Sequence, residues 1–212
     1  MAEPIGNNSH LIDTGLYGPL HGACYLVEDA GEFAIIDTGT HHTVPRILAD
    51  IAALGAGPEQ VRYVMPTHVH LDHAGGAGQL MEACPNATLV VHPRGLPHMI
   101  DPSKLQAGAI GVYGEEAFMR DFGELIAIPE GRTLAASDQQ IFELGGRRVQ
   151  FIVTPGHAHP DGGFLVHLGG EGYTGVACGL GCGPVRQGRA PLLGAGSTPV
   201  AFEPAAGLAR LE

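Results

Sequence analysis

The sequence predicts an α/β fold, and three features of the chain carry this prediction. Residues 33–65 have the pattern of a strand, a helix and a second strand, an order that favours a right-handed parallel crossover. Residues 10–37 have the pattern of an antiparallel meander, and residues 140–153 that of a hairpin with a Gly-Gly turn. The 212 residues are enough to bury about 70% of the surface of the unfolded chain. We therefore expect one domain over residues 1–212.

The elements of the first half follow from their apolar spacing. Strands are expected over residues 11–14, 23–27 and 33–37, with a glycine-bearing turn between the last two. A helix is expected over residues 43–54, because apolar side chains recur there at steps of three and four. Thr43 can cap this helix, Pro45 suits its first turn and Gly55 follows its end. A strand over residues 61–65 completes the crossover, so the loop after Met65 lies at the carboxyl end of a parallel strand, where α/β sheets usually carry their sites.

The elements of the second half are less regular. A helix opens at residues 74–76 and continues over 79–84, and a strand follows at 87–92. Helical spacing returns at 105–113 and 116–125, where we expect helices over the entrance to the site. The aromatic and methionine side chains of these two helices fit ordinary packing better than a substrate pocket: Tyr113, Phe118, Met119 and Phe122. Strands are expected over residues 126–129, 140–144 and 148–153.

Composition narrows the classes of function. The formal net charge of -11 disfavours a surface that follows nucleic-acid phosphates, since such proteins usually carry a basic face. No apolar run reaches the length of a membrane span, and residues 1–8 have neither a basic nor an apolar region of a secretion signal. Four cysteines are too few for a disulfide scaffold. We therefore expect a cytoplasmic protein with a small-molecule substrate, and neither a nucleic acid nor a membrane as partner.

Histidines and a carboxylate gather in residues 65–76, which read M-P-T-H-V-H-L-D-H-A-G-G. An extended segment puts His68 and His70 on the same side, because side chains alternate with a period of two. Asp72 and His73 follow one turn later, where the backbone bends towards the next helix. Imidazole and carboxylate together favour Zn²⁺, with iron, manganese or cobalt as alternatives. The sequence therefore predicts a metal site at this loop.

Three motifs in order resemble the metallo-β-lactamase-fold superfamily. The loop matches the HxHxDH motif, residues 34–39 resemble the strand that ends in an Asp-x-Gly turn, and Thr154-Pro155-Gly156-His157 resembles the TPGH loop. The resemblance covers about residues 10–160 and implies an αββα sandwich whose C-terminal half is incomplete. It implies His157 as the third ligand of a first metal ion beside His68 and His70. Three imidazoles leave the fourth vertex of a tetrahedral zinc ion open to water, which is a catalytic arrangement.

The C-terminal part departs from that family pattern. Residues 162–197 are rich in glycine, and a change of reading frame or relaxed selection would produce such a patch. Val176 follows Tyr173-Thr174-Gly175 where the family has a bridging aspartate, and no histidine follows His167. A second metal site therefore retains only Asp72 and His73. We expect one bound ion, with a partly occupied pair as the alternative, and a homodimer that covers the exposed sheet edge.

The favoured function is a metal-dependent hydrolase that uses a zinc-activated water on an ester, thioester, lactone or lactam. Asp72 would orient that water or take its proton, and His73 would bind a second ion or polarise the substrate. Asp37 would orient a ligand or the loop backbone; alternatively it closes a turn on Thr38 or Gly39. Two other functions stay open. One is a degenerate metal-binding fold with little or no catalysis, and the other is a mononuclear iron dioxygenase of the same fold, against which Val176 counts.

Overall fold

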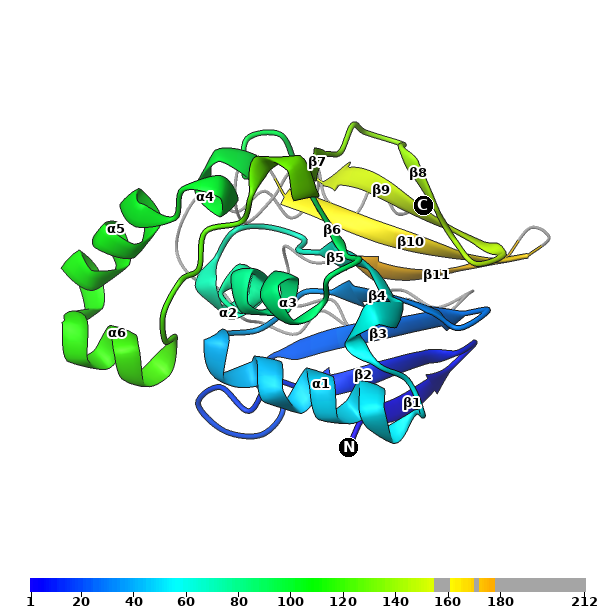
Figure 1. Ribbon diagram of the computed structural model, residues 1–212, viewed down its shortest axis with the longest axis horizontal. Helices are drawn as coiled ribbons and strands as arrows, with labels where there is room; N and C mark the ends of the chain where they lie inside the picture. The colour runs from blue at the N-terminus through cyan, green and yellow to red at the C-terminus, as the bar shows by residue number, and fades with distance from the viewer. Residues whose placement is uncertain (155–160, 170–171, 178–212) are drawn as a thin grey trace.

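Two β-sheets packed face to face form the centre of the molecule, with helices on the outer face of the larger sheet (Figure 1). The computed structural model describes residues 1–154, 161–169 and 172–177, and side chains as far as Val153. The helix, sheet and sheet layers of the predicted sandwich are therefore confirmed. No helix in these described ranges is long and apolar enough to cross a membrane.

The larger sheet has seven strands in the order of the chain. Its first four strands are antiparallel neighbours, and the last four run parallel to one another. The predicted meander is thus confirmed and gains one strand at its beginning. The strands are β1 Glu3–Gly6, β2 Ser9–Asp13, β3 Ala23–Asp29, β4 Glu32–Ile36, β5 Val61–Met65, β6 Thr88–Val91 and β7 Thr133–Ala135.

The predicted crossover from β4 through a helix to β5 is confirmed, since these two strands pair in parallel. The α-helices are α1 Val44–Ala53, α2 Leu71–Ala74, α3 Ala77–Ala83, α4 Leu96–Ile100, α5 Ser103–Tyr113 and α6 Glu115–Asp121. Short 3-10 turns precede α1, β5 and β7: η1 His41–Thr43, η2 Pro58–Gln60 and η3 Glu130–Arg132. Figure 1 shows α1, α2 and α3 over the larger sheet, whereas α5 and α6 project from one end of the molecule.

The smaller sheet is antiparallel, in the order β11-β10-β9-β8. Its strands are β8 Ile141–Leu144, β9 Arg147–Thr154, β10 Asp161–Gly169 and β11 Gly172–Ala177. The predicted Gly145-Gly146 turn between β8 and β9 is confirmed, and Gly145 adopts φ +57° there. This left-handed conformation is one that glycine reaches without strain.

Two apolar layers lie on the two faces of the larger sheet. Along β4, Phe33 and Ile35 belong to the cluster under the helices, whereas Ala34 and Ile36 belong to the cluster between the sheets. Residues 33–36 are all apolar because a central strand that is covered on both faces has no polar side. The two layers hold the carboxyl end of β4 next to that of β5, and this placement sets up the site.

Three predicted elements differ in the structure. Residues 126–129 form no strand; Ile128 is buried and its N–H bonds to the Met99 carbonyl, while Pro129 has no N–H to offer a ladder. The helix expected over residues 116–125 ends at Asp121, because Gly123 adopts φ +75° at a point where a side chain would come within 2.7 Å of the His41 Cβ. Thr43 occupies the N-cap position of α1 as predicted, but its side chain makes no cap hydrogen bond there: the hydroxyl accepts from the Thr40 N–H at 3.2 Å and closes η1 instead.

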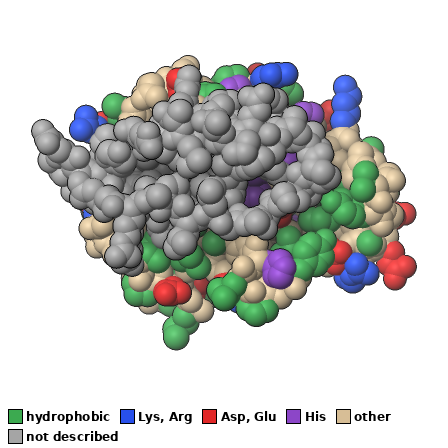
Figure 2. Space-filling view, turned by 180° about the vertical axis from the view of Figure 1, so that it is seen from behind, with side chains coloured by type: hydrophobic (Ala, Val, Ile, Leu, Met, Phe, Trp, Pro, Cys, Tyr) green, Lys and Arg blue, Asp and Glu red, His purple; other side chains and the backbone are tan. Residues whose placement is uncertain are grey.

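The helices after β6 pack beside the histidine-rich loop. Phe118 and Phe122 are buried against Leu71, which lies between His70 and Asp72. These two aromatic rings are therefore packing residues, as predicted, whereas Tyr113 and Met119 are about half exposed. On the face that lies behind in Figure 1, hydrophobic side chains of the described residues lie beside both acidic and basic ones (Figure 2).

Arg132 joins η3 to the end of α3. Its guanidinium donates to the carbonyl oxygens of Met81 at 2.6 Å, Cys84 at 2.6 Å and Ala87 at 2.9 Å. The last carbonyls of a helix have no partner within the helix, so these bonds satisfy groups that would otherwise need water.

We expect Arg132→Met to lower the free energy of unfolding by about 2 kcal/mol, because hydrogen bonds to a charged group contribute about 1.5–3 kcal/mol. Urea denaturation followed by circular dichroism measures this change. Arg94 is exposed, so Arg94→Met is the control and should change stability by less than about 0.5 kcal/mol. Equal losses in the two variants would contradict the role given to Arg132.

Candidate metal centre

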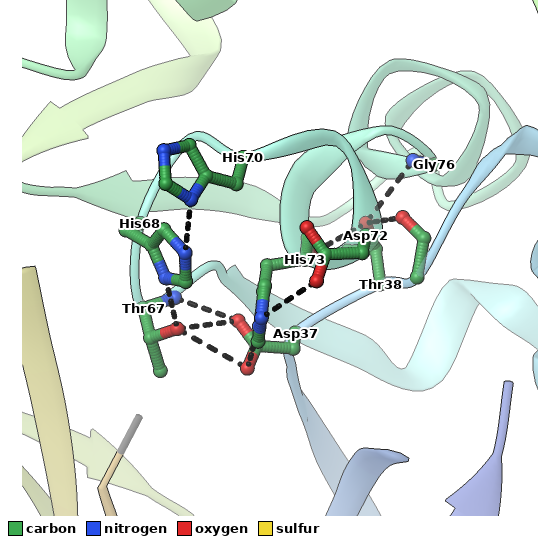
Figure 3. Close-up of polar contacts among 9 residues, drawn as sticks. Asp37, Thr38, Thr67, His68, His70, Asp72, His73 and Gly76 are labelled. Carbon is green, nitrogen blue, oxygen red and sulfur yellow. Dashed lines mark hydrogen bonds and ion pairs between the residues drawn. The ribbon is translucent and has the colours of Figure 1, made fainter. Parts of the chain in front are cut away.

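The histidine-rich loop leaves β5 at its carboxyl end and brings two imidazoles together. His68 is buried, and His70 lies at the residue before α2 in an extended conformation. The His68 Nε2 and His70 Nδ1 atoms are 3.0 Å apart, and the two rings meet edge to face (Figure 3). Sequence reasoning placed these two side chains on one side of the chain, and the structure does the same.

The separation of these two nitrogens fits a shared metal ion. Two imidazole nitrogens bound to one tetrahedral zinc at about 2.0–2.1 Å lie roughly 3.3–3.4 Å apart. The observed 3.0 Å therefore needs to open by only a few tenths of an ångström. Neutral imidazole nitrogen is also a preferred zinc donor, so both the geometry and the chemistry of this pair suit the ion that the sequence predicts.

Asp72 and His73 lie inside the short helix α2, rather than at a bend before a helix as expected from sequence. The Asp72 Oδ2 and His73 Nε2 atoms are 3.3 Å apart. The His73 ring also lies against the His68 ring, with centroids 4.1 Å apart. A single helical turn therefore brings the second pair of predicted donors beside the first.

Asp37 joins the two pairs. It follows β4, is 1% exposed and adopts φ +57°, a left-handed conformation that costs energy for a residue other than glycine. Its Oδ1 accepts the Thr67 N–H at 2.8 Å and the Thr67 hydroxyl at 2.8 Å, and its Oδ2 accepts from His73 Nδ1 at 2.9 Å. These contacts agree with the predicted orienting role of Asp37 and not with a turn closed on Thr38 or Gly39.

Thr38 ties the loop from the other side. Its N–H and its hydroxyl both donate to the His73 carbonyl, at 2.6 and 2.9 Å, and its hydroxyl accepts from the Gly76 N–H at 3.2 Å. A side chain at Gly76 would come within 2.7 Å of Val44 and 2.8 Å of the Thr40 carbonyl. Sequence reasoning missed Thr38 and Thr67 as site residues. The available signal was a hydroxyl residue next to a predicted site residue, since Thr38 directly follows Asp37 and Thr67 directly precedes His68.

Electrostatics favour an ionised Asp72. Burial by itself raises the pKa of this carboxyl, but the hydrogen bond and charge of His73, with the charge of His68, hold the pKa well below its ordinary value. Burial raises the pKa of the Cys24 thiol well above its ordinary value, and the charge of Asp37 adds to that effect while His73 opposes it. Asp72 is thus available as an anionic donor or base, whereas Cys24 is a neutral thiol.

His157 lies in residues 155–160, outside the described residues, so its role as third ligand stays a prediction. The side chain of Val176 likewise lies beyond the described side chains. Within the part of the chain that the structure describes, no three His, Cys, Asp or Glu side chains converge as a complete metal site. His92 accepts at Nδ1 from the Arg94 N–H at 3.1 Å.

A family model described as the metallo-beta-lactamase superfamily matches residues 17–175. Curated relatives include the N-acyl homoserine lactonase AttM of Azorhizobium caulinodans, 31% identical over 124 residues, or 57% of this chain and 41% of that protein. The AttM of Agrobacterium fabrum is 30% identical over 118 residues, or 56% and 40%. The matched region thus spans about two fifths of the length of these lactonases.

Solved structures show the same fold. The subclass B3 metallo-beta-lactamase MEM-A1, from a soil metagenome library, has a TM-score of 0.61 at 23% identity, covering 82% of this chain and 60% of that one. A metallo-beta-lactamase of Cronobacter sakazakii has a TM-score of 0.58 at 25% identity, covering 78% and 57%. The αββα sandwich that the sequence motifs implied is therefore the fold of this chain.

We expect Asp37→Asn to weaken zinc binding by about 10–100-fold, the cost typical of losing a group that orients metal ligands. An amide has a single acceptor oxygen, so it cannot serve both Thr67 and His73 as the carboxylate does. Competition with a chromophoric chelator measures the zinc affinity.

Asp101→Asn is the matched control, since Asp101 is exposed and accepts one backbone N–H, from Ser103. Its zinc affinity should equal that of the unmodified protein. A folded Asp37→Asn variant that binds zinc with unchanged affinity would contradict the orienting role of Asp37.

Proposed function

The chain belongs to the metallo-β-lactamase superfamily, and from this premise we propose that it is a zinc-dependent hydrolase acting on a lactone or a related acyl compound. One observation carries the proposal. Two pairs of metal donors, His68 with His70 and Asp72 with His73, occupy one loop and are joined through a single buried carboxylate. The same loop lies at the carboxyl end of a parallel strand, where substrates reach α/β sheets.

His68 Nε2, His70 Nδ1 and a nitrogen of His157 hold the ion in this proposal. A zinc ion held there would supply a nucleophile at neutral pH, since zinc lowers the pKa of a bound water from 15.7 to about 7. Burial of His68 and the contacts of Asp37 keep the donor atoms in place before the ion arrives. Such preorganisation lowers the entropic cost of binding.

Asp72 orients the water or takes its proton in this proposal. Its side chain is half exposed, at 51%, and its Oδ2 lies 3.3 Å from His73 Nε2. Its lowered pKa keeps it ionised at neutral pH, which favours the orienting role, because proton transfer is most effective for a base whose pKa lies near the working pH. His73, held by Asp37 at Nδ1, directs its other nitrogen to the same side as Asp72 and can polarise the substrate or bind a second ion.

A lactone is the favoured substrate class among ester, thioester, lactone and lactam. The AttM relatives are called N-acyl homoserine lactonases, and their similarity spans more than half of this chain. MEM-A1, by contrast, is below 25% identity and bears on the fold alone.

We expect the zinc-loaded protein to open lactone rings and His68→Ala to lower kcat/KM by roughly 100-fold or more, because an imidazole that holds the ion is lost. A pH indicator follows the acid released from lactones, and parallel assays use thioesters, simple esters and β-lactams. A chelator should remove the activity, and added zinc should restore it.

His10→Ala is the control, because His10 lies on β2 and the metal loop follows β5. It should retain full activity. If zinc-loaded protein turns over none of the four substrate classes faster than His68→Ala, the hydrolase proposal is wrong, and a metal-binding fold without catalysis takes its place.

A further inference from the structure

We propose that Thr67 is a positioning residue whose hydroxyl links Asp37 to His68 and so holds His68 in the tautomer that carries its proton on Nδ1 and presents Nε2. This inference rests on the proposed metal centre only for its effect on metal binding. The tautomer itself is a property of the chain without metal, and it can be measured without any substrate.

Asp37 accepts the hydroxyl proton of Thr67. A carboxylate has acceptor oxygens and no proton to give. The Thr67 hydroxyl lies 2.8 Å from Oδ1 and 3.1 Å from Oδ2 of this carboxylate. The hydroxyl is therefore the donor in that contact.

His68 meets the same hydroxyl oxygen at Nδ1. A hydroxyl has one hydrogen, and Thr67 has given it to Asp37. The same Thr67 Oγ1 lies 3.2 Å from His68 Nδ1, so in this contact the oxygen accepts and the ring nitrogen donates. A neutral imidazole with its proton on Nδ1 has its lone pair on Nε2. Nε2 is the atom 3.0 Å from His70 Nδ1, as Figure 3 shows.

The Asp37 carboxylate thus holds two imidazole rings, those of His68 and His73. Its Oδ2 lies 2.9 Å from His73 Nδ1, so it fixes His73 directly, while it fixes His68 through the threonine hydroxyl. Thr67, Asp37 and His68 are 0%, 1% and 2% exposed. Bulk water therefore does not reach this link to replace the hydroxyl, and valine at position 67 would remove the acceptor that the Thr67 hydroxyl offers to His68 Nδ1.

A purely structural role for Thr67 makes a different prediction. The Thr67 N–H already bonds to Asp37 at 2.8 Å, and this bond survives any side-chain replacement. If the hydroxyl only strengthened the attachment of the loop, its removal would lower stability and leave the tautomer of His68 unchanged.

The experiment compares the metal-free protein with Thr67→Val, Thr67→Ser and Thr43→Val, each labelled with ¹⁵N at histidine. Long-range ¹H–¹⁵N correlation spectra, recorded in chelator above the pH range where histidine titrates, identify which ring nitrogen carries the proton. The loss of signals in His68→Ala assigns His68. Thr43→Val is the matched control, because Thr43 is also buried and its hydroxyl bonds to backbone atoms of Thr40 and Thr14.

We expect His68 to carry its proton on Nδ1 in the unmodified protein, in Thr67→Ser and in Thr43→Val. Thr67→Val should move the His68 population to the Nε2–H tautomer, the form that free histidine favours. Zinc affinity, measured with the metal alone by chelator competition, should fall by about 10–100-fold in Thr67→Val and return with Thr67→Ser.

A His68 proton on Nε2 in the unmodified protein overturns the inference, and so does an unchanged Nδ1–H tautomer in Thr67→Val. If Thr67→Val does not fold, the spectrum of the unmodified protein still decides, because the inference requires Nδ1–H there. A protein that hydrolyses no acyl substrate but shows these tautomers would refute the proposed function and leave this inference standing.

Discussion

The buried carboxylate of Asp37 is the constraint on which the site depends, because it joins segments that are far apart in the chain. It bonds to Thr67, 30 residues away, and to His73, 36 residues away. These segments meet because β4 and β5 run parallel and end at the same edge of the sheet. The apolar layers on both faces of β4 hold that edge in place.

A buried charge is costly unless it is paired and hydrogen-bonded. Asp37 meets that condition with three donors, two from Thr67 and one from His73. Its left-handed backbone adds strain, which persists only where surrounding contacts determine the conformation. Thr38 supplies such contacts through the His73 carbonyl and the Gly76 N–H. The left-handed conformation of Asp37 therefore lowers the stability of the fold, while the contacts that maintain it orient the donor atoms of the site.

The sequence predicted the crossover, the meander, the Gly-Gly hairpin and the family, which the match over residues 17–175 confirms. It failed where a local pattern competed with a distant contact. Residues 126–129 are rich in strand formers, yet Ile128 bonds to Met99 rather than to a neighbouring strand. Thr43 stands where a cap is expected, yet its hydroxyl serves Thr40. Propensity describes a segment alone and is overridden when tertiary partners are available.

The sequence by itself determined the kinds of donor atom and their spacing in the histidine-rich loop. It also determined the order of the helices and strands around that loop. All of these are properties of neighbouring residues and of their periodicity. Only the tertiary structure decided that Asp37 contacts both Thr67 and His73, and that the hydroxyl of Thr67 meets His68. Those contacts depend on how far β4 and β5 extend past one another. In the pairing of β4 with β5, Ile36 lies opposite Met65, and this pairing relates two strands that a whole helix separates in the chain, so no local pattern states it.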